Sequence, residues 1–255
     1  MKRLLVAILS LFACFMTSAK DTRCFELRTY SAAPGKLDDL HNRFRNHTLQ
    51  LFEKHGIENI GYWVPMDKDG KPENKLIFLL AYPSRDAREK SWSAFQSDPE
   101  WQAASKASEA KGRLVTNVQN PYLEATDYSP DIKTSKADPP RIFELRTYKT
   151  PPERLNALHA RFRDHTLKLF SKHGMTNFGY FTPMDEKHGK DNTLVYILAH
   201  KSREAAAASF DAFRKDADWV AARKASEEKA GGSLTLPTNG VVSVFMTPTD
   251  YSPTR

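Results

Sequence analysis

Residues 41–56 read HNRFRNHTLQLFEKHG, and residues 159–174 repeat them as HARFRDHTLKLFSKHG. The second copy differs only at the positions of Asn42, Asn46, Gln50 and Glu53. Both copies keep three histidines and two arginines at the same places and end in Lys-His-Gly. The chain therefore carries a duplicated helix, and its fold has to be read as two related halves.

The same spacing of 118 residues links further segments on both sides of this helix. The segment FELRTY stands at 25–30 and again at 143–148. The motif Thr-Asp-Tyr-Ser-Pro stands at 126–130 and 249–253, so the spacing grows by five residues near Gly231-Gly232. The Pro- and Lys-containing stretch between the copies is typical of a linker. The sequence predicts repeat 1 over 20–130, a linker over 131–141 and repeat 2 over 142–255.

Each half shows the same order of predicted elements. In the first half, segments rich in β-forming residues predict strands at 25–30, 57–66, 76–82 and 122–128. Helical spacing of apolar residues that stops at Gly56 predicts a helix over 36–55, and residues 67–72 should form a hairpin turn. A second helical region, 84–109, should break near Asp98-Pro99 because proline cannot continue a helix interior. The order βαββαβ predicts an α+β fold made of two tandem ferredoxin-like repeats.

The third strand of each repeat predicts how the two halves combine. Residues 76–81 (LIFLLA) are apolar at every position, and residues 194–199 (LVYILA) nearly so. A half-exposed strand would alternate, so both faces of each sheet should be buried. Helices cover one face, and the other copy's sheet can cover the second. We expect the two antiparallel sheets to stack into a pseudo-dimeric α+β barrel within one chain, with the helices outside.

The N-terminus has the pattern of a secretory signal peptide over residues 1–19. Lys2 and Arg3 precede an apolar run over 4–16, and small residues follow at 17–19. The run is shorter than the roughly 20 apolar residues of a transmembrane helix, so we expect an exported protein, periplasmic or secreted. The alternative is a lipoprotein anchored through Cys14. If the segment is removed, Cys24 is the only thiol, either a small core residue or an intermolecular bridge.

Charge argues against nucleic acid as a partner. The formal charge is +7, and losing Lys2 and Arg3 lowers it to +5. Basic and acidic residues are interleaved, whereas nucleic-acid binding favours a concentrated basic face. The expected partners are a small-molecule ligand and no nucleic acid, with no transmembrane segment; a homo-oligomer beyond the internal pseudo-dimer stays open.

Several motifs together resemble the NIPSNAP family, within the dimeric α+β barrel superfamily. They are FELRTY, Glu-Lys-His-Gly followed by Ile-Gly-Tyr-Trp, Asp-Pro-Glu-Trp and Thr-Asp-Tyr-Ser-Pro, and they cover nearly the whole mature chain, twice. The second copy departs from the pattern at Phe181 for Trp63, Phe210 for Trp92 and Ala217 for Pro99. The resemblance implies the barrel fold but no settled reaction. Related barrels include cofactor-free monooxygenases and haem-binding enzymes, and mitochondrial family members suggest membrane-traffic or scaffold roles.

Arg43 and His47 are the sharpest candidate pair. They stand four residues apart on one flank of the predicted helix, so both could reach a cavity between helix and sheet. There the arginine would hold an anionic or enolic oxygen, and a neutral histidine would accept a proton. The plain alternative is a hydrogen-bonded histidine at the edge of the core beside a solvated arginine. Aromatic residues would wall the cavity, so the candidate ligand-binding set is Arg43, His47, Tyr62, Trp63, Arg161, His165, Tyr180 and Phe181.

Alternation in the first strand separates an apolar face from a polar one. Phe25, Leu27 and Thr29 share one face, and Glu26, Arg28 and Tyr30 share the other. If the apolar face meets the helices, the polar face points into the barrel. The buried charges would then have to pair with each other or with their counterparts Glu144 and Arg146.

Metal and cofactor chemistry find little support. His41, His47 and His55 are six and eight residues apart, not the spacing of four that puts two ligands on one helical face. Geometry allows a haem on His47, but no attachment motif supports it. Three hypotheses remain: a protein that binds a small, partly apolar ligand, a cofactor-free oxygenase or isomerase with His47 and His165 as bases, and a non-catalytic interaction or scaffold module. A cavity lined by His47 and Arg43 and large enough for a ligand would separate the first two from the third.

Overall fold

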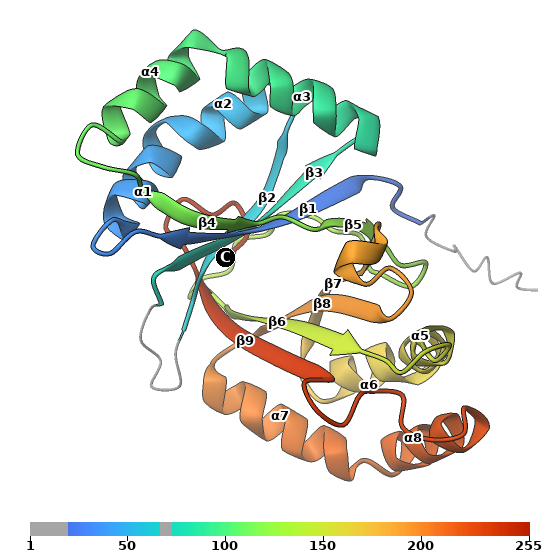
Figure 1. Ribbon diagram of the computed structural model, residues 1–255. Coiled ribbons are helices and arrows are strands. Elements are labelled where there is room, and N and C mark those ends of the chain that lie inside the picture. Colours follow the sequence, from blue (N-terminus) through green and yellow to red (C-terminus); the bar gives the residue numbers. More distant parts are fainter. Residues whose placement is uncertain (1–19, 67–72) are drawn as a thin grey trace, which may run out of the picture.

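The computed structural model describes residues 20–66 and 73–255. The predicted signal peptide (1–19) and hairpin turn (67–72) lie outside the described residues. In Figure 1 the strands form the middle of the molecule, with α1 to α4 on one side and α5 to α8 on the other. This is the arrangement expected for a barrel with its helices outside.

The helices and strands follow nearly the same order in both repeats. The first repeat contains β1 (Cys24–Ala32), α1 (Leu37–Arg43), η1 (Phe44–Thr48), α2 (Leu49–Lys54), β2 (Glu58–Pro65), β3 (Lys75–Tyr82), α3 (Arg85–Ser97), α4 (Pro99–Ser108), β4 (Val115–Gln119) and β5 (Tyr122–Ala125). The second contains β6 (Ile142–Lys149), α5 (Leu155–Arg161), η2 (Phe162–Thr166), α6 (Leu167–Lys172), β7 (Thr176–Pro183), η3 (Glu186–His188), β8 (Thr193–His200), α7 (Arg203–Lys215), α8 (Ala217–Lys229) and β9 (Val241–Pro248). The second repeat therefore adds the short helix η3 and has one strand, β9, where the first has β4 and β5.

The two repeats share one closed antiparallel barrel rather than two separate sheets. The strand order β3-β2-β9-β6-β8-β7-β5-β1 closes because β1 also pairs with β3, and β4 lies beside β1. The repeats meet where β2 pairs with β9 and β5 pairs with β7. Each junction satisfies backbone groups that an isolated repeat would leave exposed at its sheet edges. The predicted barrel is confirmed, and its halves are joined edge to edge by hydrogen bonds.

The barrel interior is apolar, and this reverses the predicted orientation of the first strand. Phe25 and Leu27 point inward, where they join a core that both repeats supply. Glu26 and Arg28 instead face the helices, where Arg88 and Tyr82 hydrogen-bond the carboxylate. The expectation that these charges point into the barrel is therefore wrong. The interior offers hydrocarbon neighbours, whereas the helix side offers the partners that a buried carboxylate needs.

Each long helix of the duplicated segment contains a π turn. The helix predicted over 36–55 runs from Leu37 to Lys54 and is continuous, but η1 interrupts its α-helical hydrogen bonding. The Thr48 hydroxyl donates to the Arg43 carbonyl, five residues earlier, at 3.2 Å. His55 is the C-cap of this helix, and Gly56 follows with a φ of +71°, as a C′ glycine often does. η2 repeats the arrangement in the second repeat.

The predicted break in the second helical region is confirmed. α3 ends at Ser97, and Pro99 is the first residue of α4. The Asp98 carboxylate caps α4 by accepting from the Glu100 backbone N–H, and it also contacts His55 Nε2 at 2.7 Å. His55 therefore ties the end of α2 to the start of α4, which gives this histidine a structural role.

The Thr-Asp-Tyr-Ser-Pro motifs cross from one repeat to the other. Tyr251, at the end of the second repeat, hydrogen-bonds His41 Nδ1 at 2.7 Å, and Asp250 forms a two-pronged ion pair with Arg45. The second repeat has the same contacts in return, with partners from the first: Tyr128 with His159, and Asp127 with Arg163. These contacts account for one histidine and one arginine of each duplicated helix.

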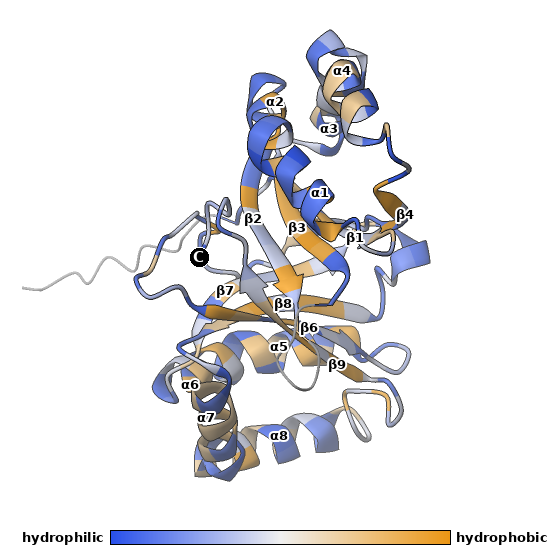
Figure 2. Cartoon of the chain, turned by 90° about the vertical axis from the view of Figure 1, so that its left-hand side faces the viewer, coloured by the Kyte–Doolittle hydropathy of each residue, from blue (hydrophilic) through white to orange (hydrophobic). Residues whose placement is uncertain are grey.

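Hydropathy follows the layers, with hydrophobic residues concentrated on the strands and hydrophilic residues on the outer helices (Figure 2). In the described part of the chain, no helix is both long and apolar enough to cross a membrane. Cys24 is buried as a free thiol, and burial raises its pKa to about 11. It is thus a small core residue, one of its two predicted roles.

Candidate functional site

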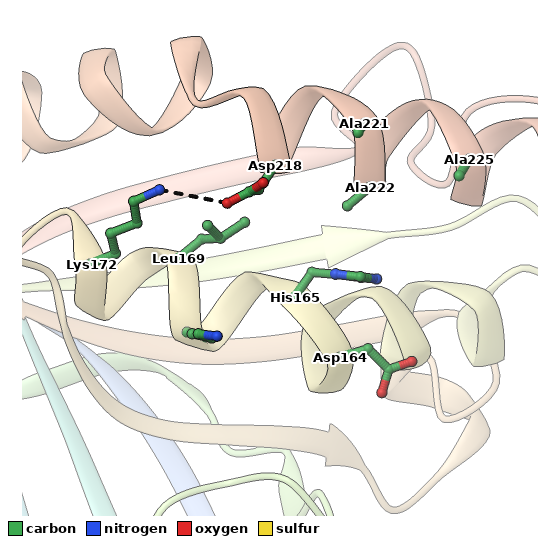
Figure 3. A pocket seen from close by; sticks show the side chains of 9 residues that line it. Asp164, His165, Leu169, Lys172, Asp218, Ala221, Ala222 and Ala225 are labelled. Atoms are coloured by element: carbon green, nitrogen blue, oxygen red, sulfur yellow. Dashed lines mark ion pairs between the residues drawn. The ribbon is translucent and has the colours of Figure 1, made fainter.

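The two candidate bases lie in grooves between helices, on the outer side of the helical layer. His165 lines a hollow of about 710 Å³ whose other wall includes Ala221, Ala222 and Ala225 of α8. Figure 3 shows His165 in the space between its own helix and α8. In the first repeat, His47 lines a groove of about 320 Å³ beside α4. Both side chains are exposed, so the prediction that they enter a helix–sheet cavity is wrong.

The π turn explains why Arg43 is buried and His47 is exposed, although they stand four residues apart. The spacing-of-four rule assumes 3.6 residues per turn, and a π turn contains more. Arg43 immediately precedes η1 and is buried, whereas His47 lies within it and is exposed. Arg161 and His165 separate in the same way around η2. The two side chains of each pair nevertheless line one groove between helices: Arg43 and His47 share the groove beside α4, and Arg161 and His165 share a hollow of about 360 Å³ beside α8.

A cavity between helices and sheet does exist, in the second repeat. It has a volume of about 280 Å³ and lies between β6 and the helices η2, α7 and α8. Aromatic rings make up much of its wall: Tyr148, Phe162, Phe170, Phe210, Phe213 and Trp219. Four arginines and one glutamate also line it: Arg146, Arg161, Arg214, Arg223 and Glu227. An apolar pocket with a few convergent polar groups is the usual form of a small-molecule site.

Arg161 is the least satisfied charge in this wall. Its side chain is 5% exposed, and its guanidinium lies 5.2 Å from the Trp219 ring centroid. Its ion pair with Glu227 is long, at 3.4 Å, and Arg223 contacts the same carboxylate oxygen at 3.2 Å. Its Nε has no hydrogen-bond partner in the described part of the chain. Burial lowers the pKa of Arg161, and Glu227 only partly offsets this.

Arg146 is held rigidly at the sheet side of the cavity. It donates to the hydroxyls of Tyr196 and Tyr148, at 2.8 and 3.1 Å, and forms a short ion pair with Glu144. Burial works against its charge, but the neighbouring tyrosines and Glu144 leave its pKa raised. Buried His200 contacts the other oxygen of Glu144 at 3.0 Å. A polar chain from His200 through Glu144 thus positions the Arg146 guanidinium at the cavity.

The other predicted ligand-binding residues do not gather in this cavity. Tyr62 and Tyr180 are fully buried in the helix–sheet cores, where each donates to the asparagine three residues earlier. Trp63 and Phe181 lie inside the barrel, on the opposite face of the sheet. Arg43 lines the outer groove of the first repeat. Of the eight predicted residues, Arg161 alone lines the helix–sheet cavity.

Several cavity residues were not singled out from the sequence as ligand contacts. They are Arg146, Tyr148, Phe210, Arg214, Trp219, Arg223 and Glu227. The signal that could have found some of them is the difference between the repeats: Phe210, Arg214 and Arg223 stand where the first repeat has Trp92, Gln96 and Ser105. Among the described residues, no group of three or more His, Cys, Asp or Glu could hold a metal ion.

The closed barrel with a helix–sheet cavity defines the class of the protein as a dimeric α+β barrel, here formed within one chain. Two solved structures share this fold over most of their length. An anthrone oxidase-like protein is 13% identical, with a TM-score of 0.56, over 93% of this chain and 96% of its own. A candidate monooxygenase from Fusobacterium nucleatum is 12% identical, with a TM-score of 0.53, over 89% and 92%. At these identities the likeness concerns the fold alone.

The NIPSNAP family model matches residues 25–130 and again 143–253. A NipSnap homolog from Dictyostelium discoideum is 25% identical over 206 residues, which are 79% of this chain and 80% of that protein. The chain therefore belongs to the NIPSNAP family and carries two tandem copies of its domain. The resemblance seen in the sequence motifs is confirmed.

Proposed function

We propose that this protein is an exported tandem of ferredoxin-like NIPSNAP repeats that binds a small carboxylate with a flat apolar body. The site is the helix–sheet cavity of the second repeat. The observation that carries the proposal is the charge balance at Arg161: two guanidiniums, those of Arg161 and Arg223, share one oxygen of Glu227. A ligand carboxylate would give the buried Arg161 a partner for its free Nε and an oxygen that it does not share with Arg223.

The remaining wall favours an aromatic or otherwise flat ligand. Rings of Phe162, Phe210 and Phe213 line the cavity together with Trp219. A volume of about 280 Å³ exceeds the roughly 150 Å³ of a cavity that holds benzene, so the cavity has room for a substituted ring such as benzoate. Edge and face contacts with such rings add specificity to apolar burial. The proposal thus deepens the ligand-binding hypothesis by placing it at Arg161.

The cofactor-free oxygenase or isomerase hypothesis would have to use the grooves between helices, where Arg43 lies with His47 and Arg161 with His165. Neither His47 nor His165 lines the helix–sheet cavity, so neither could take a proton from a substrate bound there. If a substrate instead binds the outer grooves, replacing both histidines by alanine should abolish turnover. Unchanged turnover would remove them as bases.

The test compares three probes by ligand-observed NMR and isothermal titration calorimetry. Benzoate carries the charge and the ring, benzamide keeps the ring without the charge, and hexanoate keeps the charge without the ring. We expect benzoate to bind most tightly and benzamide most weakly, because the neutral amide of benzamide offers no negative charge to the Arg161 guanidinium. Equal binding of benzoate and benzamide, or no binding of either, would refute the proposal. Native mass spectrometry of the protein purified from the periplasm tests both export and a co-purified carboxylate.

A further inference from the structure

The two repeats differ at the positions that would decide whether a ligand enters between helix and sheet. Both keep the buried arginine before the π turn, and in both it lies 5.2 Å from a tryptophan ring. In both repeats this arginine contacts a glutamate at 3.4 Å: Glu109, just after α4, and Glu227, in α8. The two repeats therefore share this arginine, tryptophan and glutamate arrangement, and they differ in the residues around it.

The glutamate beside the buried arginine has different neighbours in the two repeats. Arg43 has Glu109 as its ion-pair partner, and it also lies 3.5 Å from the Ser108 hydroxyl. Ser105, a neutral residue, stands where the second repeat has Arg223. One cation therefore faces one carboxylate in the first repeat, whereas two share one carboxylate oxygen in the second. Arg223 is 59% exposed, so solvent screens much of its charge, but it shares with the buried Arg161 the oxygen that Arg161 contacts.

Side-chain volume differs in the same direction. In the first repeat the Trp92 indole lies over both Arg28 and Arg88, at 4.2 and 4.7 Å, and packs beside Phe52. The second repeat has the smaller ring of Phe210 at this place, 4.7 Å from Arg146. Arg88, which binds the buried Glu26 in the first repeat, is replaced there by Ala206.

Exposure of the strand arginine follows from these substitutions. The Arg28 side chain is 6% exposed beneath Trp92 and beside Arg88, and the Arg146 side chain is 14% exposed. Arg146 reaches the cavity wall of the second repeat. Trp92 and Arg88 thus occupy the side of the strand arginine that the second repeat leaves open.

We propose that the tandem repeats are functionally divided: the chain has a single ligand site, in the second repeat, and Phe210 is the residue whose size admits the ligand. The first repeat fills the equivalent space with its own Trp92, and there Arg43 pairs with Glu109 without an arginine at the position of Arg223, so it serves the barrel as a structural partner. This inference rests on the proposed function, since it concerns how many such ligand sites the chain has and which residue admits the ligand to the site.

The experiment is a calorimetric titration with benzoate of the full chain and two variants. The wild type should bind one benzoate per chain. Phe210→Trp should weaken binding at least about tenfold, while its Tm stays within about 4 °C of the wild type because the added ring enters existing space. Trp92→Phe/Ser105→Arg, which gives the first repeat two of the second repeat's residues, should raise the stoichiometry from one to two.

The outcomes separate this inference from the proposed function. Two sites in the wild type, or wild-type affinity in Phe210→Trp, would overturn the division of the repeats while leaving the second-repeat site intact. A stoichiometry that stays at one in Trp92→Phe/Ser105→Arg would overturn Trp92 and Ser105 as the residues that close the first repeat. No benzoate binding by the wild type would refute the proposed function and this inference with it.

Discussion

Replacing Arg161 by methionine should cost ligand affinity without costing stability. Methionine keeps most of the apolar stem that packs beside Trp219 and removes the guanidinium. Glu227 keeps Arg223 as a partner at 3.2 Å, so no buried carboxylate is left without a cation. Removal of one partner of a buried ion pair usually destabilises a protein because the other charge is left buried without a partner. In the Arg161→Met variant, Glu227 still has a partner, so this cost should not arise.

The expected sizes follow from this geometry. A hydrogen bond to a charged group contributes about 1.5–3 kcal/mol, which corresponds to a benzoate affinity about 10- to 150-fold weaker. The free energy of unfolding should change by no more than about 1 kcal/mol, because the buried Nε without a partner disappears together with the long ion pair. Isothermal titration calorimetry measures the first quantity and urea denaturation the second.

The matched control is Arg43→Met in the first repeat. Arg43 has nearly the same surroundings, including an unpartnered Nε and a glutamate at 3.4 Å, but it does not line the second-repeat cavity. Its replacement should leave benzoate affinity unchanged. If Arg161→Met binds benzoate within threefold of the wild type, or if Arg43→Met loses as much affinity, the assignment of Arg161 as the anion contact is refuted.

Three further predictions concern the fold. Burial lowers the pKa of both His41 and His159 from 6.5. The unfolded chain therefore binds more protons than the folded chain, so Tm should fall as the pH drops below about 6.5. The double variant His41→Gln/His159→Gln should flatten the profile of Tm between pH 7 and 5. Gly61→Ala should destabilise by about 1–3 kcal/mol in urea, because a Cβ there would lie 2.3 Å from the buried Trp63 ring; an unchanged midpoint would contradict this packing. Tyr251→Phe removes the hydrogen bond to His41 and should cost about 1 kcal/mol, with no change in benzoate binding; a cost near zero would mean that the inter-repeat contact adds no stability.

Much of the architecture could be predicted because local signals and the duplication agreed. Gly56 marked a helix end, Asp98-Pro99 marked a helix break, and the unbroken apolar run over 76–81 required cover on both faces. Duplication supplied the second sheet that provides this cover. What could not be read was which face of β1 turns inward, since that depends on helix residues such as Arg88, far away in the sequence.

The candidate site was harder to predict for a physical reason. The π turn changes the number of residues per turn at the point where the proposed arginine–histidine pair sits, and no local rule predicted it. Arg161 was found because it precedes the turn, and His165 was misplaced because it lies within it. Residues shared by both repeats turned out to include contacts that hold the repeats together, such as His159 with Tyr128. The cavity wall combines residues that both repeats share, such as Arg161 and Trp219, with Phe210, Arg214 and Arg223, which differ between the repeats.

The most direct test of the proposed site is a crystal structure with 4-bromobenzoate, in which anomalous scattering locates the bromine without reference to any expected pose. The account predicts one bromine per chain, in the cavity between β6 and α7–α8, with the carboxylate within hydrogen-bond distance of Arg161. A bromine confined to the outer groove beside His165, or one of equal occupancy in each repeat, would contradict it.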